Sequence, residues 1–320
     1  MLPRLFRGVS VLAAVLVVAA CAGATPAPAA PVTVRFAMLP ILDALPMFVA
    51  QDKGYFAAEG IDLQVVPAAS AAARDQLMQA GQGDAMVNDL VSTLFYNKDA
   101  VTLKVVRYAR TATADFAQYF ILAGPGTGIT DAAGLKGVDI AISEATTIQY
   151  VTDRLLAAEG LTPEDIRTVA IPNIVDRMTA LANGGVPAAA MPDPAAASAI
   201  ASGARIVVSD AAHPELGHSE LSFSAAFVAA HPEAVRGFLR AWEKAVADIN
   251  ADKTAWNSLL AANKLLSDQL IDSYLLPDYP TAAVPTEAQF RDVNDWAKER
   301  GLINKDLSYA DSVDSSFLPK

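Results

Sequence analysis

Side chains able to hold a small molecule lie at or just beyond the ends of four stretches that we predict to be strands. These strands are expected at 32–38, 85–88, 138–142 and 188–191. The residues in question are Leu42, Asp43, Asn88, Asp89, Ser143, Glu144, Thr146, Thr147 and Asp193. Ligands of open α/β sheets bind outside the carboxyl ends of the strands. We therefore expect these residues to line a small-molecule site, with Tyr119 or Gln118 reaching the ligand from a crossing between two lobes.

The charges of these segments favour one class of ligand. Four carboxylates lie in them, and they contain no arginine or lysine. Burying an anion beside carboxylates without a compensating cation is costly. We therefore expect a cation or a ligand rich in N–H donors. Arg107 and Arg110 would weaken this expectation if they reached the site, but we expect them at a solvated strand end.

The same residues also have structural explanations. Asp43, Asn88 or Asp89, Ser143 and Thr146 could each cap a helix that follows. Asp193 lies between two prolines and could fix a turn. The segment 143–147 is rich in serine and threonine and begins a predicted helix, and such helix N-termini bind anions readily. An anionic ligand thus stays open as an alternative.

Motifs of catalysis and metal binding are incomplete in this sequence. The stretch GPGTG at 124–128 has no following Lys-Ser/Thr, so we interpret it as a turn. No G-x-S-x-G is present. His213, Glu215, His218 and Glu220 could ligate a metal, but they lack the H-E-x-x-H order and are expected in a surface loop. We therefore expect no catalytic residue, no metal and no cofactor.

The N-terminus has the pattern of an export signal. Arg4 and Arg7 precede an apolar run at 9–20 that is too short to span a membrane comfortably. The run ends in VAAC, which resembles the bacterial lipobox, so we expect a signal peptide at 1–20 and lipidation of Cys21. An ordinary signal peptide with a chance cysteine is the alternative. Residues 21–31, rich in alanine and proline, are expected to form a flexible tether. The expected location is the periplasm or the outer face of the cell membrane.

Composition limits the possible partners. The chain has 320 residues, a formal charge of −11 and 53% hydrophobic residues. It carries no basic cluster beyond its first residues, which argues against nucleic acid as a partner. Cys21 is the only cysteine, so no internal disulfide can form.

The order of elements predicts two lobes. Strands and helices alternate at 32–118 and again at 121–220, and a mostly helical segment follows. Crossings between lobes are expected near 119–122 and 219–224. We predict an α/β fold with two lobes joined by two short hinge strands, with 32–118 plus 223–320 in the first lobe and 119–222 in the second. Each sheet is expected to be parallel, and the protein to be a monomer.

Later helices are expected at four places. An apolar stripe at helical spacing predicts a core-facing helix at 232–250. Further helices are predicted at 253–263, 267–274 and 286–300.

Four longer segments together resemble one protein family. LPILDALPMFVAQDKGYFAAEGIDLQVV contains a strand end, a polar loop and the turns A-x-x-x-G-[YF]-F and E-G-[ILV]-[DE]. QLMQAGQGDAMVND, GLKGVDIAISEATTIQYVTDRLLAAEGL and HPEAVRGFLRAWEKAVADIN follow in matching order. With these segments the chain resembles the nitrate/sulfonate/taurine-type substrate-binding proteins of ABC importers, a group that includes binders of thiamine precursors.

The resemblance implies a two-lobed periplasmic-binding-protein fold that delivers a solute to an ABC permease and its ATPase. It places ligand contacts on the same four segments. Together with the carboxylates, it favours an aminopyrimidine or another heterocyclic vitamin precursor as ligand. The alternatives are a sulfonate- or nitrate-type anion binder, an exported enzyme on the same scaffold, and a sensory or scaffold lipoprotein. Related eukaryotic enzymes that make the thiamine pyrimidine carry a cysteine-rich motif, which has no counterpart here.

Overall fold

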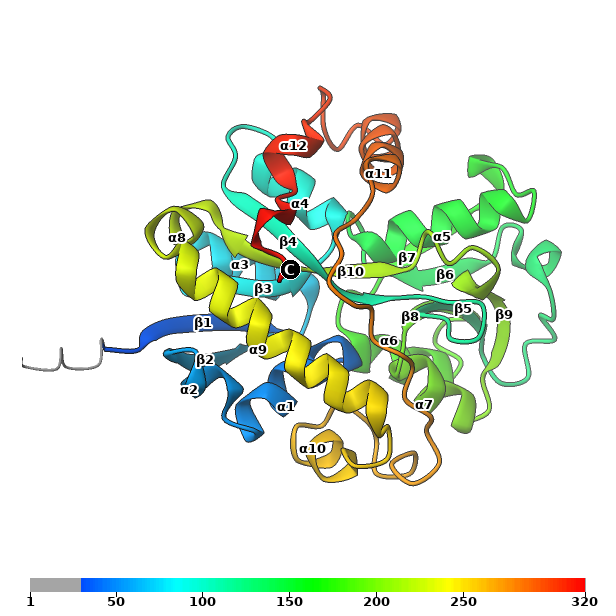
Figure 1. The fold of residues 1–320 in the computed structure, drawn as a ribbon. Coiled ribbons are helices and arrows are strands. Elements are labelled where there is room, and N and C mark those ends of the chain that lie inside the picture. Colours follow the sequence, from blue (N-terminus) through cyan, green and yellow to red (C-terminus); the bar gives the residue numbers. More distant parts are fainter. Residues whose placement is uncertain (1–29, 320) are drawn as a thin grey trace, which may run out of the picture. The chain divides into compact units, whose positions relative to one another are not determined.

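The computed structural model describes residues 30–319. The predicted signal peptide, most of the predicted tether and Cys21, the predicted lipidation site, therefore lie outside the described residues. Within them the chain forms two five-stranded sheets covered by helices (Figure 1).

The first sheet has the strand order β2-β1-β3-β10-β4. Its strands are β1 (Val32–Met38), β2 (Ile61–Pro67), β3 (Ala85–Asn88), β4 (Leu103–Thr111) and β10 (His218–Ser224). β1 pairs in parallel with β2 and β3, whereas β10 is antiparallel to β3 and β4. The sheet is therefore mixed, not parallel as expected, because β10 enters it from the second lobe in the reverse direction.

The second sheet repeats this arrangement in the order β7-β6-β8-β5-β9. Its strands are β5 (Tyr119–Ala123), β6 (Asp139–Ile142), β7 (Arg167–Ala170), β8 (Ala188–Pro192) and β9 (Arg205–Ser209). β6 pairs in parallel with β7 and β8, and β5 is antiparallel to β8 and β9. Here the reversed strand is β5, by which the chain enters the second lobe.

Helices connect the strands and cover the sheets. The first lobe has α1 (Leu45–Asp52), α2 (Tyr55–Ala58), α3 (Ala71–Gln79) and α4 (Leu90–Asn97), and the second has α5 (Thr147–Ala158), α6 (Ile174–Ala182) and α7 (Ala195–Ala201). The C-terminal part adds α8 (Ala225–Ala230), α9 (Pro232–Ala251), α10 (Asn257–Ala262), α11 (Glu287–Glu299) and α12 (Tyr309–Ser312). Helices are thus the main regular elements of the C-terminal part, but they cover only about half of it, and residues 263–286 contain none.

The core of the first lobe forms around α9, as its apolar stripe predicts. Val235, Phe238 and Trp242 are fully buried. The Phe238 ring stacks on Phe36 of β1 with 5.6 Å between centroids. Figure 1 shows α9 running past α1 and α2. Burial of such aromatic side chains contributes roughly 1.5–3 kcal/mol each, which fixes the sheet against this helix.

One predicted helix is absent. Residues 267–274 form single turns, in which Ser267 O accepts from Leu270 N and Leu270 O accepts from Tyr274 N. Leu266 and Leu276 are buried on either side of this segment. Packing at its two ends takes precedence over its helix propensity, which is a weak preference.

The two crossings between the sheets lie side by side. The chain leaves β4 through residues 112–118 and returns through 210–217. Gly217 O accepts from Ala112 N at 2.6 Å, and the Asp210 carboxylate accepts from the backbone N–H groups of Gln118 and Tyr119 at 2.8 and 3.1 Å. The second crossing was predicted near 219–224, but it lies earlier in the chain, at 210–217. The reason is that residues 218–224 form β10, which already belongs to the first sheet.

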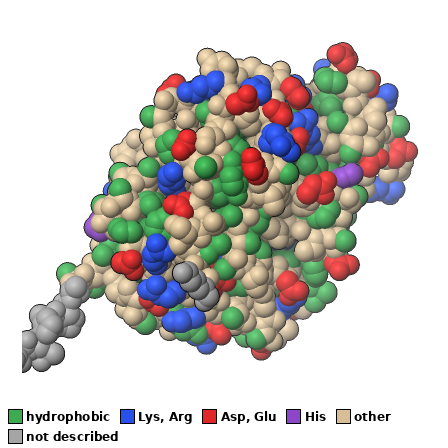
Figure 2. Space-filling model, turned by 45° about the horizontal axis from the view of Figure 1, so that its top comes forward, with side chains coloured by type: hydrophobic (Ala, Val, Ile, Leu, Met, Phe, Trp, Pro, Cys, Tyr) green, Lys and Arg blue, Asp and Glu red, His purple; other side chains and the backbone are tan. Residues whose placement is uncertain are grey.

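The surface carries charges of both signs. Figure 2 shows acidic and basic side chains interspersed on the face that it draws. Within residues 30–319, no helix combines the length and the apolar character that crossing a bilayer requires.

Candidate functional site

A small cavity lies at the strand ends of both lobes. Its volume is about 60 Å³. Its lining residues are Leu39, Ile41, Ala71, Tyr119, Ser143, Thr146, Thr147, Ile148, Pro172, Ile174, Arg177 and Pro192. They lie at or just beyond the ends of β1, β6, β7 and β8, at the start of β5, and near the starts of α3, α5 and α6. We call this space the head cavity.

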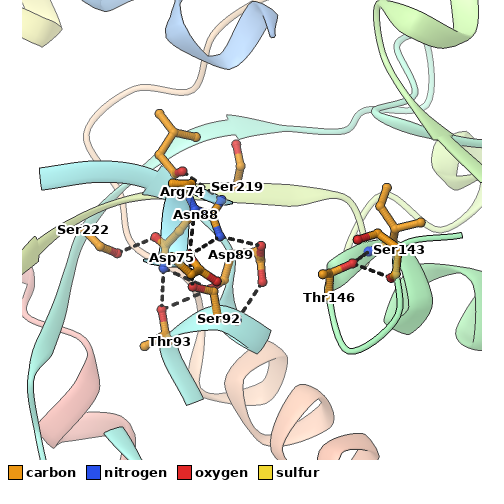
Figure 3. A network of polar contacts seen from close by, with 12 residues as sticks. Arg74, Asp75, Asn88, Asp89, Ser92, Thr93, Ser143, Thr146, Ser219 and Ser222 are labelled. Atoms are coloured by element: carbon orange, nitrogen blue, oxygen red, sulfur yellow. Dashed lines mark hydrogen bonds and ion pairs between the residues drawn. The ribbon is translucent and has the colours of Figure 1, made fainter. Parts of the chain in front are cut away.

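Four of the predicted site residues line the head cavity: Tyr119, Ser143, Thr146 and Thr147. Thr146 caps α5, because its Oγ1 accepts from Ile148 N at 3.2 Å and donates to Ser143 O at 2.7 Å (Figure 3). Its capping role and its place in the cavity are therefore compatible. Because the first residues of α5 line the cavity, the positive end of the α5 dipole lies beside it.

Arg177 is the lining residue that the sequence did not suggest. Only 1% of it is exposed, and its Nη1 donates to Ile171 O at 2.7 Å. Its Nε is buried without a hydrogen-bond partner, and it forms no ion pair within residues 30–319. Burial lowers the pKa of Arg177 to about 10. A buried cation without a counter-ion is costly, so an anion in the head cavity would stabilise it.

No local pattern in the sequence singles out Arg177. It is the fourth residue of α6, beyond the first turn, to which the effect of the helix dipole is largely confined.

Asp43 and Asp193 both form ion pairs with the buried Arg110. Arg110 Nη2 lies 2.8 Å from Asp193 Oδ2, and Nη1 lies 3.8 Å from Asp43 Oδ1. Tyr274 also donates to Asp193, and Ser219 donates to Asp43 at 2.6 Å. Burial raises the pKa of Asp43, while Arg110 and Ser219 act against this rise. Neither carboxylate lines the head cavity.

The expectation of solvated arginines on β4 is wrong. Arg107 and Arg110 are 0% and 1% exposed. Arg107 pairs with Glu243 and donates to Pro280 O at 2.6 Å. The segment after α10 covers β4, as the bond from Tyr108 N to Ala283 O at 2.8 Å records. The sequence alone does not show that the segment after α10 packs over β4 and buries these arginines.

Asn88 and Asp89 belong to a second internal network (Figure 3). Asp89 caps α4, since its Oδ1 accepts from Ser92 N at 2.8 Å, and its Oδ2 lies 3.6 Å from Arg74 Nη2. Asn88 accepts from Ser222 Oγ at 2.6 Å. Burial raises the pKa of Asp89, against the attraction of Arg74. Neither residue lines the head cavity.

The two remaining predicted residues also lie elsewhere. Leu42 is fully buried in the core of the first lobe, and its carbonyl accepts from Tyr279 Oη at 2.6 Å. Glu144 is exposed, so its charge does not enter the head cavity.

The histidine segment is only partly a surface loop. His213 is partly exposed near Glu215, but His218 is buried in β10, where its Nδ1 contacts Glu220. β10 runs between two neighbouring strands, which buries both side chains. Among the described residues, no group of three or more histidine, cysteine or acidic side chains could hold a metal ion.

A larger cavity adjoins the head cavity. Its volume is about 620 Å³, and Ile41 and Ile174 line both spaces. Its other lining residues are Pro40, Ala69, Asn173, Val175, Met178, Pro194, Ala195, Ser198, Ala261, Lys264, Leu265, Leu266, Ser267 and Asp268. We call this space the vestibule. Most of these side chains are apolar.

Comparison with known proteins gives one family match. The model of a family described as NMT1/THI5 like matches residues 42–254. No curated protein sequence matches significantly.

Solved structures show the same fold at low sequence identity. The alkanesulfonate-binding protein SsuA from Xanthomonas axonopodis pv. citri, bound to MOPS, is 18% identical with a TM-score of 0.74, over 89% of this chain and 99% of that one. The nitrate-binding protein NrtA from Synechocystis PCC 6803 is 17% identical with a TM-score of 0.72, over 90% and 87%. The desulfurization enzyme DszB is 17% identical with a TM-score of 0.66, over 89% and 97%. The expected two-lobed α/β fold is thereby confirmed.

Proposed function

This chain belongs to the NMT1/THI5 like family, and we propose that it is an extracytoplasmic solute-binding protein of an ABC importer that captures a small oxoanion. The resemblance expected from the four sequence segments is confirmed at the level of the family and the fold. The sulfonate- and nitrate-binding neighbours support the transport role.

The observation that carries the choice of an anion is the unpaired Arg177. Its guanidinium is buried beside the head cavity, without a carboxylate partner in the described chain. The N-terminus of α5 lines the same space. An oxoanion would accept from both, and hydrogen bonds between charged partners are the stronger ones.

The case for an aminopyrimidine or other N–H-rich ligand loses its premise. That case needs free carboxylates at the site, but Arg110 pairs with Asp43 and Asp193, and Arg74 lies beside Asp89. With its carboxylates paired elsewhere, the site offers a free cation instead. The sulfonate- or nitrate-type alternative is therefore the better supported ligand class.

The mechanism we propose is closure of the lobes on the ligand. The contacts of Asp193 with Arg110 and Tyr274 join the end of β8 to the first lobe. Crossings 112–118 and 210–217 form the hinge. A ligand that contacts both lobes favours the closed form, which then docks on a permease. The lipid anchor on Cys21, the periplasmic or outer-face location and the monomeric state remain predictions.

Titration calorimetry with a panel of solutes tests this function. We expect saturable binding of nitrate or a short alkanesulfonate, and none of an aminopyrimidine. The same mixtures are analysed for products, because DszB is an enzyme on this fold. Binding of the heterocycle alone would refute the anion proposal, and turnover would favour the enzyme alternative.

A further inference from the structure

Resting on the proposed function, we propose that α11 latches the two lobes together in the closed form, and that its polar contacts with α5 help to set the affinity for the solute. Asp153 of α5 is then a positioning residue, which acts on the solute site through α5 and does not line it. None of the side chains that form the latch lies in the head cavity.

The first step is that α11 is anchored in the first lobe. Phe290 and Val293 of α11 are buried in one apolar cluster with Leu94 of α4. The Gln289 side chain of α11 accepts from Tyr108 Oη of β4 at 2.6 Å. Figure 1 shows α11 between α4 and α5. We therefore expect α11 to move with the first sheet when the lobes rotate.

The second step is that α11 reaches the second lobe through polar side chains. Asp153 of α5 accepts from Trp296 Nε1 at 2.8 Å and from Arg300 Nε at 2.9 Å. Asp292 of α11 accepts from Tyr150 Oη of α5 at 2.6 Å. We call the contacts among these five residues the α11 latch. They add a third connection between the lobes to the two crossings of the chain.

The chemistry of the α11 latch suits a contact that opens and closes. Asp153 and Trp296 are buried in this form, at 7% and 1% exposed. Burial raises the pKa of Asp153, and the bonds from Trp296 and Arg300 act against this rise. When the lobes separate, water can replace these partners at a small net cost, because polar groups exchange one hydrogen bond for another. The apolar packing of α11 on α4 has no such replacement in water.

A groove beside the α11 latch leaves room for movement. Its volume is about 660 Å³. Tyr150 of α5, Asp292 of α11 and Leu216 of the second crossing all line it. The three parts that change position when the crossings bend thus meet around an open space, whereas the interior of a lobe is close-packed.

The α11 latch acts on the solute site through α5. Thr146 and Thr147, at the start of this helix, line the head cavity, and Asp153 lies about two turns further along it. Contacts that exist only in the closed form raise the population of that form. The apparent Kd of a solute rises as the binding-competent form becomes less populated. Weakening the α11 latch should therefore weaken binding without changing any group that touches the solute.

Substitutions on both sides of the α11 latch test the proposal. Arg300→Gln, Asp153→Asn and the double variant are titrated by calorimetry with methanesulfonate and with nitrate. We expect each single variant to raise the Kd about tenfold, which corresponds to the loss of one charge-assisted hydrogen bond. The double variant should add little to the larger single effect. Lys298→Gln is the matched control, because Lys298 is also a paired, partly exposed cation of α11, but its partners Asp295 and Asp306 lie in the C-terminal part.

The indole N–H of Trp296 gives a readout that needs no solute. Its exchange with solvent is followed by NMR on isotope-labelled tryptophan, with Trp242 and Trp256 in the core of the first lobe as internal references. Arg300→Gln should speed exchange at Trp296 about tenfold, because local opening becomes easier, and should leave the references unchanged. Bound methanesulfonate should slow the exchange in the wild type.

The outcomes separate the α11 latch from the proposed function. A raised Kd in both single variants, with faster exchange at Trp296 and wild-type behaviour of Lys298→Gln, supports the latch. Anion binding with an unchanged Kd in Arg300→Gln and Asp153→Asn, or with a Kd raised equally in Lys298→Gln, overturns the latch and leaves the proposed function intact. If the wild type binds neither anion, the proposed function is wrong and the exchange measured without solute decides on the latch. Faster exchange in Arg300→Gln alone then supports a latch for another solute, and equal exchange in Arg300→Gln and Lys298→Gln overturns it.

Discussion

Substitution of Arg177 by glutamine is expected to weaken anion binding and, at the same time, to stabilise the ligand-free protein. The lowered pKa gives the size of the second effect. Burial lowers the pKa of Arg177 from its usual range to about 10, and a shift of this size corresponds to about 3 kcal/mol of destabilisation at neutral pH. For a base with a lowered pKa this cost is fully present below pH 10, and it disappears only as the pH rises above 10 toward the pKa of an arginine in the unfolded chain. Glutamine removes it.

One smaller term opposes this gain in stability. The bond from Arg177 to Ile171 O contributes about 1 kcal/mol, part of which a glutamine amide can replace. We therefore expect the free energy of unfolding to rise by about 2 kcal/mol. Loss of charge-assisted hydrogen bonds to the ligand, at about 1.5–3 kcal/mol, should raise the Kd of an oxoanion about tenfold or more.

Urea unfolding without ligand and calorimetric titration with an alkanesulfonate measure the two effects. Arg205→Gln is the matched control, since it removes an exposed arginine of the same lobe and should change stability by less than about 0.5 kcal/mol. A variant at Arg177 that binds as tightly as wild type would refute the assignment. So would a variant that is destabilised by more than about 1 kcal/mol, because the guanidinium would then be paired in the free protein.

Three further predictions concern the contacts between the lobes. Asp193→Asn should destabilise the protein by about 3 kcal/mol in urea unfolding, because it leaves Arg110 less compensated; an unchanged midpoint would contradict this. Burial raises the pKa of Asp210 from 3.8 to about 6, so the folded state binds the proton more tightly and stability should fall by about 3 kcal/mol from this group as the pH rises from 4 to 6. Asp210→Asn should remove that part of the pH dependence. If the stability of the variant changes with pH as that of the wild type does, this prediction is wrong. At Gly217 an added methyl would clash with Asp210 and lie 2.7 Å from Ala112 Cβ, so Gly217→Ala should lower stability by about 1–3 kcal/mol in thermal unfolding, and an unchanged Tm would show that the crossings can separate.

Local patterns predicted the elements that depend on neighbours in the sequence. The apolar stripe of α9 and the threonine cap of α5 were both readable, because helical spacing and capping act within a few residues. Thr146 and Thr147, which the same segment suggested, line the head cavity, and their contact with a ligand stays a prediction.

Contacts between distant segments could not be predicted in the same way. Arg110 and Asp193 are 83 residues apart in the chain, so nothing in either segment indicates that they pair. Their pairing reverses the charge balance inferred for the site. Residues 267–274 have helix propensity but form turns. The flanking Leu266 and Leu276 are buried against residues from elsewhere in the lobe, and the local sequence does not show this.

The most direct test of the central claim is a native mass spectrum of the protein purified without denaturation from the cell that makes it. We predict a bound small molecule that carries an acidic oxoanion group, and that is lost from Arg177→Gln. A co-purified cationic or neutral heterocycle, retained by that variant, would contradict the account.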